Sequence, residues 1–295
     1  MKPKLIEFQS GDDICRAKLF VSNEPSSIIV IITAAIGQIQ EQAPLQYAER
    51  LSKLGLNAVT FDHRYFGLSD GAPRQLEHPE RKVEDIEALA KNLKQSPIIG
   101  DITYVVSLGI CKGGAYSLQA ASRCESIDAF IGVSGFYFDD VSLEAASGYK
   151  QERIDQGKLA LDRYQKDGTI DYLPITSDTR KDAALPYAAL HAWYAPWETY
   201  SRWQNRYAVM SDYYIYQLLS KPHAEALHKP ALIIHANKST NPGSAKQVFE
   251  LIPHEQKRLC FYEDGVDFQT NFYEREALIN RACGDTRDWL RELFQ

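Results

Sequence analysis

Buried strands alternate with amphipathic helices along the first 135 residues, and this order constrains the fold more than any other feature of the chain. Residues 28–33 are all β-branched, which is typical of a strand buried on both faces. Residues 41–54 carry apolar side chains at helical spacing and are followed by Gly55, a common helix stop. Both patterns recur, predicting strands at 56–61, 103–108 and 127–133 and helices at 81–93 and 113–123. Such alternation predicts a mainly parallel sheet covered by helices on both faces.

The same rhythm returns near the end of the chain after a long interruption. Short strands are expected at residues 5–8 and 15–21; later strands are expected at 231–235 and 257–262, and later helices at 243–251 and 274–293. Residues 138–227 contain no buried-strand pattern: a polar helical stretch at 142–163 precedes a strongly aromatic one. We therefore predict an α/β core made of residues 1–137 and 226–295, with a helical, aromatic-rich cap at 138–225. An insertion that leaves the carboxyl end of a strand lies over the ligand crevice of such a sheet.

One motif carries most of the chemistry. The strand at 103–108 runs into Gly109-Ile110-Cys111-Lys112-Gly113, and a helix follows. This is the strand–turn–helix pattern of a nucleophile elbow, with cysteine where serine is more usual. The two glycines allow strand and helix to approach closely, so that Cys111 projects above the sheet edge as a nucleophile. The helix N-terminus and the Lys112 cation favour its thiolate, whereas the alternative is a buried structural cysteine in an ordinary turn.

Further stretches accompany the elbow: Gln40-Glu41-Gln42, residues 61–69 (FDHRYFGLS), Gly71-Ala72-Pro73-Arg74 and Val83-Glu84-Asp85-Ile86. Together they resemble the α/β-hydrolase superfamily, and in particular its dienelactone-hydrolase-like and related esterase- or peptidase-like branch. The resemblance implies an acid after the strand at 231–235 and a histidine after the last strand. It also implies an oxyanion hole formed by the main-chain N–H of Lys112 and that of Ile36 or of the residue before it.

Both partner positions of the implied triad hold other residues. Ser239 stands about where the family has aspartate, and residues 236–241 contain no carboxylate. No histidine occurs from residue 255 onward, and Asp267 or Gln269 takes its position, depending on the alignment. A glutamine amide is not basic, and Asp267 can act as a base only if burial raises its pKa. The sequence therefore predicts an incomplete triad, although cysteine is the nucleophile least dependent on a base.

Two histidines elsewhere are candidates for a substitute base. His235 ends a strand beside the position of the missing acid, and His191 lies in the aromatic part of the cap. The alternative for His235 is a partly buried strand-end residue, and for His191 a surface or packing residue.

Ten aromatic residues fall within residues 187–216. Such side chains offer rigid apolar area with polar tips, which suits the lining of a ligand pocket. We assign Trp193, Trp197, Trp203 and Tyr207 to substrate binding, which implies an apolar acyl, aromatic or polyketide-like ligand. The alternative is that these residues only pack the cap together.

Composition and charge exclude several other classes of protein. The chain has 33 basic and 39 acidic residues mixed along its length, so we expect no nucleic-acid partner. No apolar run approaches about 18 residues, and no signal-peptide pattern opens the chain, so we expect no membrane span and a cytoplasmic location. The five cysteines show no C-x-x-C spacing, which predicts reduced thiols and no metal site. We expect no cofactor, and a homodimer stays open.

Two hypotheses for function follow. In the first, the protein hydrolyses, transfers or cyclises an acyl group of an ester, thioester or lactone through Cys111. In the second, it is a catalytically inactive hydrolase-like protein that binds a ligand or regulates a partner, because both the acid and the base are missing.

Overall fold

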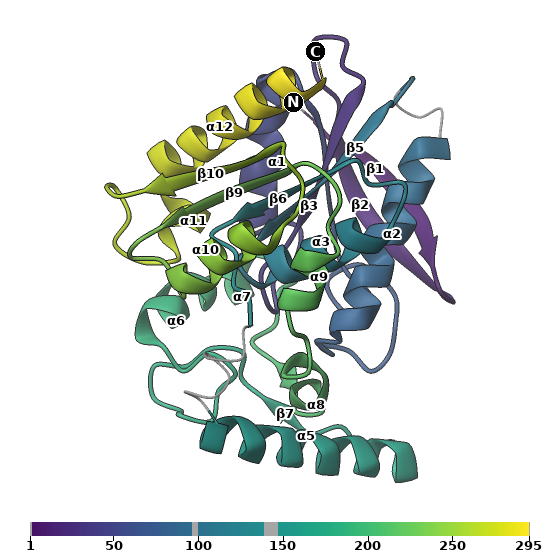
Figure 1. Ribbon diagram of the computed structural model, residues 1–295. Helices are drawn as coiled ribbons and strands as arrows, with labels where there is room; N and C mark the ends of the chain where they lie inside the picture. Colours follow the sequence, from purple (N-terminus) through teal and green to yellow (C-terminus); the bar gives the residue numbers. More distant parts are fainter. Residues whose placement is uncertain (1, 96–99, 139–146, 295) are drawn as a thin grey trace.

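Eight strands form one central sheet in the computed structural model, which describes residues 2–95, 100–138 and 147–294 (Figure 1). Their order across the sheet is β1-β2-β4-β3-β5-β6-β9-β10, with β1/β2 and β2/β4 antiparallel and every other neighbouring pair parallel. The strands are β1 (Lys4–Ser10), β2 (Asp13–Phe20), β3 (Ile28–Thr33), β4 (Asn57–Phe61), β5 (Tyr104–Ile110), β6 (Ala129–Val133), β9 (Ala231–Ala236) and β10 (Lys257–Tyr262).

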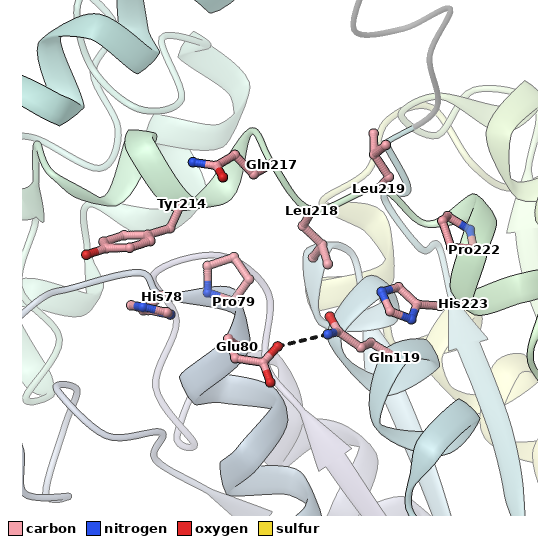
Figure 2. Close-up of a pocket in the computed structure, with 10 residues that line it drawn as sticks. All are labelled: His78, Pro79, Glu80, Gln119, Tyr214, Gln217, Leu218, Leu219, Pro222 and His223. Atoms are coloured by element: carbon pink, nitrogen blue, oxygen red, sulfur yellow. Dashed lines mark hydrogen bonds between the residues drawn. The ribbon is translucent and has the colours of Figure 1, made fainter.

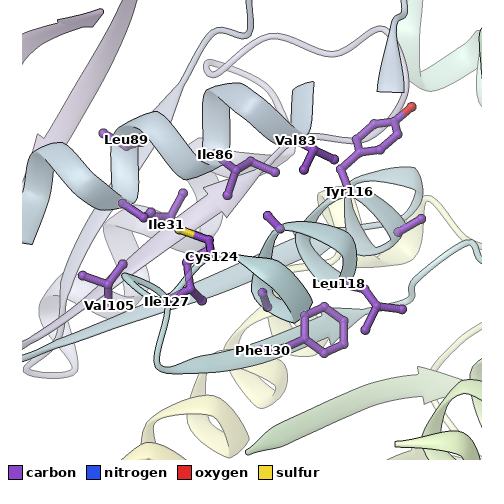
Figure 3. Close-up of a cluster of buried hydrophobic side chains, with 14 of the residues drawn as sticks. Ile31, Val83, Ile86, Leu89, Val105, Tyr116, Leu118, Cys124, Ile127 and Phe130 are labelled. Carbon is purple, nitrogen blue, oxygen red and sulfur yellow. The ribbon is translucent and has the colours of Figure 1, made fainter. Parts of the chain in front are cut away.

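Helices cover both faces of this sheet, because its central strands are apolar on both sides. The core cluster on one face includes residues of α1 (Ala43–Lys53), α11 (Asn271–Glu274) and α12 (Glu276–Phe294). The cluster on the other face includes residues of α2 (Pro79–Gln95), α3 (Lys112–Arg123), α9 (Lys221–Glu225) and α10 (Pro242–Leu251). Figure 3 shows part of the second cluster, where Val83 and Ile86 of α2 and Leu118 of α3 pack over the strands.

The predicted fold class is confirmed. The all-β-branched run at 28–33 is β3, with all six residues buried, and the other predicted strands and helices of the core are present with ends shifted by a few residues. The terminal helix differs most, because residues 271–274 form the separate short helix α11 before α12 begins.

The segment between β6 and β9 contains four described helices before α9 and a small second sheet. The helices are α5 (Ser147–Asp167), α6 (Ala188–Tyr194), α7 (Trp197–Tyr200) and α8 (Ser211–Ile215), and they lie together beyond one end of the central sheet (Figure 1). The predicted polar helix at 142–163 corresponds to α5, but its residues 142–146 lie outside the described residues. The sequence did not predict the two-residue strands β7 (Tyr172–Leu173) and β8 (Tyr207–Ala208), which pair antiparallel.

Within the described ranges, none of the helices combines the length and the apolar character needed to cross a bilayer.

Candidate active site

The strand order places the candidate site at the centre of the sheet edge. After β3 the chain adds β4 on one side of β3 and then β5 on its other side. The direction in which strands are added to the sheet therefore reverses at β3. Ligands of open α/β sheets bind outside the carboxyl ends of the strands at such a point. The loops that follow β3, β5, β6, β9 and β10 all leave from this edge.

Cys111 occupies a sharp turn between β5 and α3. Its backbone has φ 53° and ψ −123°, a left-handed conformation that a residue with a side chain rarely adopts. A Cβ on Gly109 would lie 2.1 Å from the carbonyl oxygen of Gly113, and a Cβ on Gly113 would lie 2.4 Å from that of Ala34. The predicted steric role of both glycines is therefore confirmed: they let β5, α3 and the loop after β3 meet.

The thiol of Cys111 is only partly exposed. Burial raises its pKa, and hydrogen bonds from the Tyr273 hydroxyl and from the main-chain N–H of Lys112 lower it by less. The expectation that the helix N-terminus makes Cys111 a thiolate is thus wrong for the free protein, since desolvation outweighs the helix dipole and the Lys112 cation. Tyr273, on α11, was missed by sequence reasoning because nothing in its local pattern marks it.

The loop after β3 presents the second candidate oxyanion donor. Within the described residues, the main-chain N–H of Ile36 makes no hydrogen bond, and its carbonyl oxygen accepts one from the Tyr194 hydroxyl at 3.0 Å. The next residue, Gly37, donates its N–H to Glu77 at 3.1 Å and accepts from the indole N–H of Trp203 at 2.8 Å. Side chains from the core and from the cap therefore fix this loop beside the elbow.

A buried ion pair lies behind the loop. The carboxylate of Glu77 is fully buried and lies 2.6 Å from Lys82 Nζ. It also accepts a hydrogen bond from the Tyr116 hydroxyl on α3 at 2.8 Å. Glu77 thus joins α2, α3 and the oxyanion loop, a role that the sequence did not reveal because Glu77 belongs to no recognisable motif.

The motif FDHRYFGLS also holds the loop after β3 in place. The buried carboxylate of Asp62 accepts hydrogen bonds from the main-chain N–H of Gln40 at 2.8 Å and from that of Leu68 at 2.8 Å. A Cβ at Gly67 would overlap this carboxylate at 2.2 Å, which explains the glycine there.

A neutral hydrogen-bonded cluster occupies the positions of the missing acid and base. The side-chain oxygen of Gln269 accepts hydrogen bonds from Ser134 at 2.9 Å and from Ser239, and also from the main-chain N–H of Thr240 at 3.1 Å. Its amide nitrogen donates to the carbonyl oxygen of Ser134 at 2.8 Å. The Gln269 side chain also faces Cys111, where it favours the thiolate. The structure therefore brings together Ser239 and Gln269, two of the residues predicted at the degenerate triad positions.

Asp267, the other residue that one alignment placed at the histidine position, points away from the site. Its carboxylate is exposed and pairs with Arg275 at 2.7 Å. The hydrogen bond from Arg275 lowers the pKa of Asp267, whereas a base would need a raised one. Asp267 as a base is therefore wrong.

The structure does not support either histidine as a substitute base. The ring nitrogens of His235 face the carbonyl oxygens of Ala236 at 3.2 Å and Gly135 at 3.3 Å, and burial lowers its pKa. His191 contacts the Thr176 hydroxyl at 3.2 Å and lies 3.9 Å from Asp178. No interaction of either ring with Cys111 is found in the described parts of the chain.

The four aromatic residues assigned to substrate binding divide into two pairs. Trp203 and Tyr207 are buried in the cap, where Trp203 holds Gly37 and Tyr207 donates to Asp212 at 2.7 Å. The expectation that they line a substrate pocket is not supported. Trp193 lies nearer the thiol, because its ring is 5.0 Å from that of Tyr273, and Trp197 packs against Trp193 at 5.7 Å.

A separate cavity of about 360 Å³ is lined by residues between His78 and His223 (Figure 2). Figure 2 shows that residues of α2, α3, α8 and α9 and of the segment after α8 line it, and that Gln119 donates to Glu80 there; the distance is 3.0 Å. Because Cys111 is not among its lining residues, this cavity does not locate a substrate of the thiol.

In the ranges that the structure describes, no three His, Cys, Asp or Glu side chains group closely enough to hold a metal ion.

The sheet order and the strained elbow after β5, with the loop after β3 packed beside it, define an α/β-hydrolase. More narrowly, the chain belongs to the family described as serine aminopeptidase, S33, whose model matches residues 24–266. The family is named for a serine, whereas the elbow residue of this chain is cysteine.

Relatives of this chain are known by sequence and by structure. It is 34% identical over 105 residues to the uncharacterised protein YcjY of Escherichia coli. The aligned region covers 36% of this chain and 34% of that protein. It is 28% identical over 129 residues to the thiohydrolase aneE of Aspergillus aculeatus, covering 43% and 40% of the two chains. These matches thus span about a third to two fifths of the curated relatives' length. The α/β hydrolase GrgF of Penicillium sp. sh18 has the same fold, with a TM-score of 0.81 over 99% of each chain at 19% identity.

Proposed function

We propose that the protein is an acyl-transferring hydrolase that attacks an acyl thioester, ester or lactone with the Cys111 sulfur. The observation that carries this proposal is the backbone of Cys111, held at φ 53° at the N-terminus of α3. Strain of this kind persists where the surrounding structure enforces it, and it clusters at reacting groups. A buried structural cysteine would not need such a conformation.

The two main-chain donors beside the sulfur support acyl chemistry. The N–H of Ile36 has no partner in the described chain, and that of Lys112 faces the thiol. Donors fixed before the reaction stabilise the oxyanion of a tetrahedral intermediate without reorganisation. Collapse of the intermediate would break the bond to the leaving sulfur or oxygen, which departs with a proton, and would leave the acyl group on the Cys111 sulfur. Water or a second nucleophile would then release the acyl group.

A thioester is the substrate class we favour. A sulfur nucleophile exchanges with a thiolate leaving group of similar basicity, so that the missing imidazole matters less than it would for an alcohol leaving group. A relative, aneE, is called a thiohydrolase. An apolar acyl chain is consistent with Trp193 and Tyr273 beside the thiol.

Turnover of a panel of acyl thioesters and matched oxygen esters tests this proposal. We expect thioesters to be cleaved faster than esters of the same acyl group, and Cys111→Ala to abolish turnover. Turnover retained by Cys111→Ala would remove the sulfur from the mechanism.

A second candidate is a ligand-binding protein without catalysis. The Gln269 cluster favours it, because all the hydrogen bonds of this side chain are made to the protein at the place where a base is needed. In that case acyl thioesters bind without turnover, and Cys111→Ala leaves their affinity unchanged within about threefold.

A further inference from the structure

Lys112 carries a buried amine that has no anionic partner among the described residues. The residue is 2% exposed, and its Nζ makes no hydrogen bond or ion pair within the described residues. The Nζ lies 3.4 Å from the centroid of the Phe138 ring and 5.6 Å from that of Phe136. Aromatic rings offset part of the cost of burying a cation, but an unpaired buried charge still costs several kcal/mol. A lysine kept under these conditions next to the elbow residue points to a function.

Within the part of the chain that the structure describes, none of the other groups that face the thiol can accept its proton. Burial raises the pKa of Tyr273, Tyr194 and Tyr116, so these hydroxyls stay protonated at neutral pH. The Gln269 amide is not basic. Glu77 is already held by Lys82 at 2.6 Å and by other donors.

We propose that the Lys112 amine is the proton acceptor and counter-charge of Cys111, in place of the imidazole that this site lacks. In the resting pair the sulfur holds its hydrogen and the amine is neutral. Activation breaks the S–H bond, leaves the electron pair on sulfur and forms an N–H bond on Lys112 Nζ, so the net charge of the site does not change. The proton thus passes from the thiol to the amine. The later transfer of this proton from Lys112 to a leaving group rests on the proposed function, whereas the first transfer from the thiol to the amine does not.

The electrostatics of the pair agree with this exchange. Burial lowers the pKa of Lys112 to about 7, so amine and ammonium are both available at neutral pH. The ammonium lowers the pKa of Cys111, and the thiolate raises that of Lys112. In the described ranges, Glu77 is the other charged group that acts on Lys112, and it stabilises the ammonium as well. Each member of the pair therefore favours ionisation of the other, and the two titrate together.

Alkylation of Cys111 by iodoacetamide, measured from about pH 6 to about pH 9, tests the proposal without any substrate. We expect Lys112→Met to lower the alkylation rate about tenfold at neutral pH and to move the midpoint of the profile to higher pH. The matched control is Lys229→Met, since Lys229 is half-buried near the far end of α3, where its Nζ donates to Cys124 at 2.6 Å. Its profile should follow that of the wild type.

Lys112→Arg separates charge from side-chain removal. The guanidinium stays protonated, so it supplies the counter-charge but cannot accept the thiol proton. We expect the midpoint of the Lys112→Arg profile to lie at or below that of the wild type. A midpoint as high as that of Lys112→Met would also overturn the proposal. A folded Lys112→Met protein whose profile superposes on the wild-type profile overturns the proposal.

A second measurement uses the intact lysine in case Lys112→Met does not fold. The protonation of Lys112, followed by NMR of its labelled Cε, should shift to lower pH in Cys111→Ser, because the partner thiolate is gone. An unchanged midpoint also overturns the proposal. Iodoacetamide carries no acyl group, so a shifted profile together with no acyl turnover would contradict the proposed function alone.

Discussion

Two glycines near helix N-termini differ in what an added methyl group would meet. At Gly113 it would lie 2.4 Å from the carbonyl oxygen of Ala34, whereas at Gly243 nothing lies within 4 Å. We expect Gly113→Ala to lower the free energy of unfolding by about 1–3 kcal/mol, because α3 must move away from the oxyanion loop.

Gly243→Ala is the control for this substitution. In the open first turn of α10 it should be neutral or stabilising by up to about 1 kcal/mol. Urea unfolding of both variants measures the difference, and equal stability of the two would contradict the close approach at the elbow.

Lys112 predicts how stability depends on pH. Its pKa is about 7 in the folded chain and near 10.5 when unfolded, because burial disfavours the ammonium. Between these values the unfolded state binds more protons, so stability rises with pH and is lost as pH falls through about 7. From pH 7 to about pH 8.5 the wild type should gain about 1–2 kcal/mol relative to Lys112→Met. If the difference in free energy of unfolding between the wild type and Lys112→Met stays constant over this pH range, Lys112 is not buried as an amine.

At the scale of elements, the loops after β9 and β10 meet where a triad would stand. The double variant Ser239→Asp, Gln269→His places an acid and an imidazole in this position. We expect Cys111 to be alkylated at least about tenfold faster at neutral pH in this variant, since an adjacent imidazole activates a thiol.

Ser239→Asp combined with Asp267→His is the matched control, because it adds the same two side chains with the histidine at an exposed position. Its alkylation rate should equal that of Ser239→Asp alone. An equal increase in both double variants would mean that Gln269 does not occupy the histidine position.

The elements themselves follow from local sequence, but the contacts of the site do not. The β-branched run of β3 and the glycines of the elbow predict their own structure, because each acts on its neighbours in the chain. The hydrogen bonds from Tyr194 to Ile36 and from Trp203 to Gly37 join residues more than 150 positions apart. The aromatic pattern placed Trp203 in a substrate pocket, whereas the side chain is buried in packing. Sequence could not separate the two, because cores and pockets share the same composition.

Burial also reversed an expectation about charge. The helix N-terminus and Lys112 both favour a thiolate, and the sequence shows both. Desolvation of Cys111 depends on how cap and core close over the elbow, and it raises the pKa of the thiol. Local charge can be read from a motif, whereas the dielectric around it depends on the whole fold.

For the whole molecule, the central claim is that a substrate's acyl group is transferred to one sulfur, that of Cys111. Intact-mass spectrometry after mixing with an acyl thioester, followed by peptide mapping, tests this most directly. We expect one acyl group per chain, on the peptide that contains Cys111, and none in Cys111→Ala. An unmodified chain during rapid thioester turnover, or an acyl group on another residue, would contradict it.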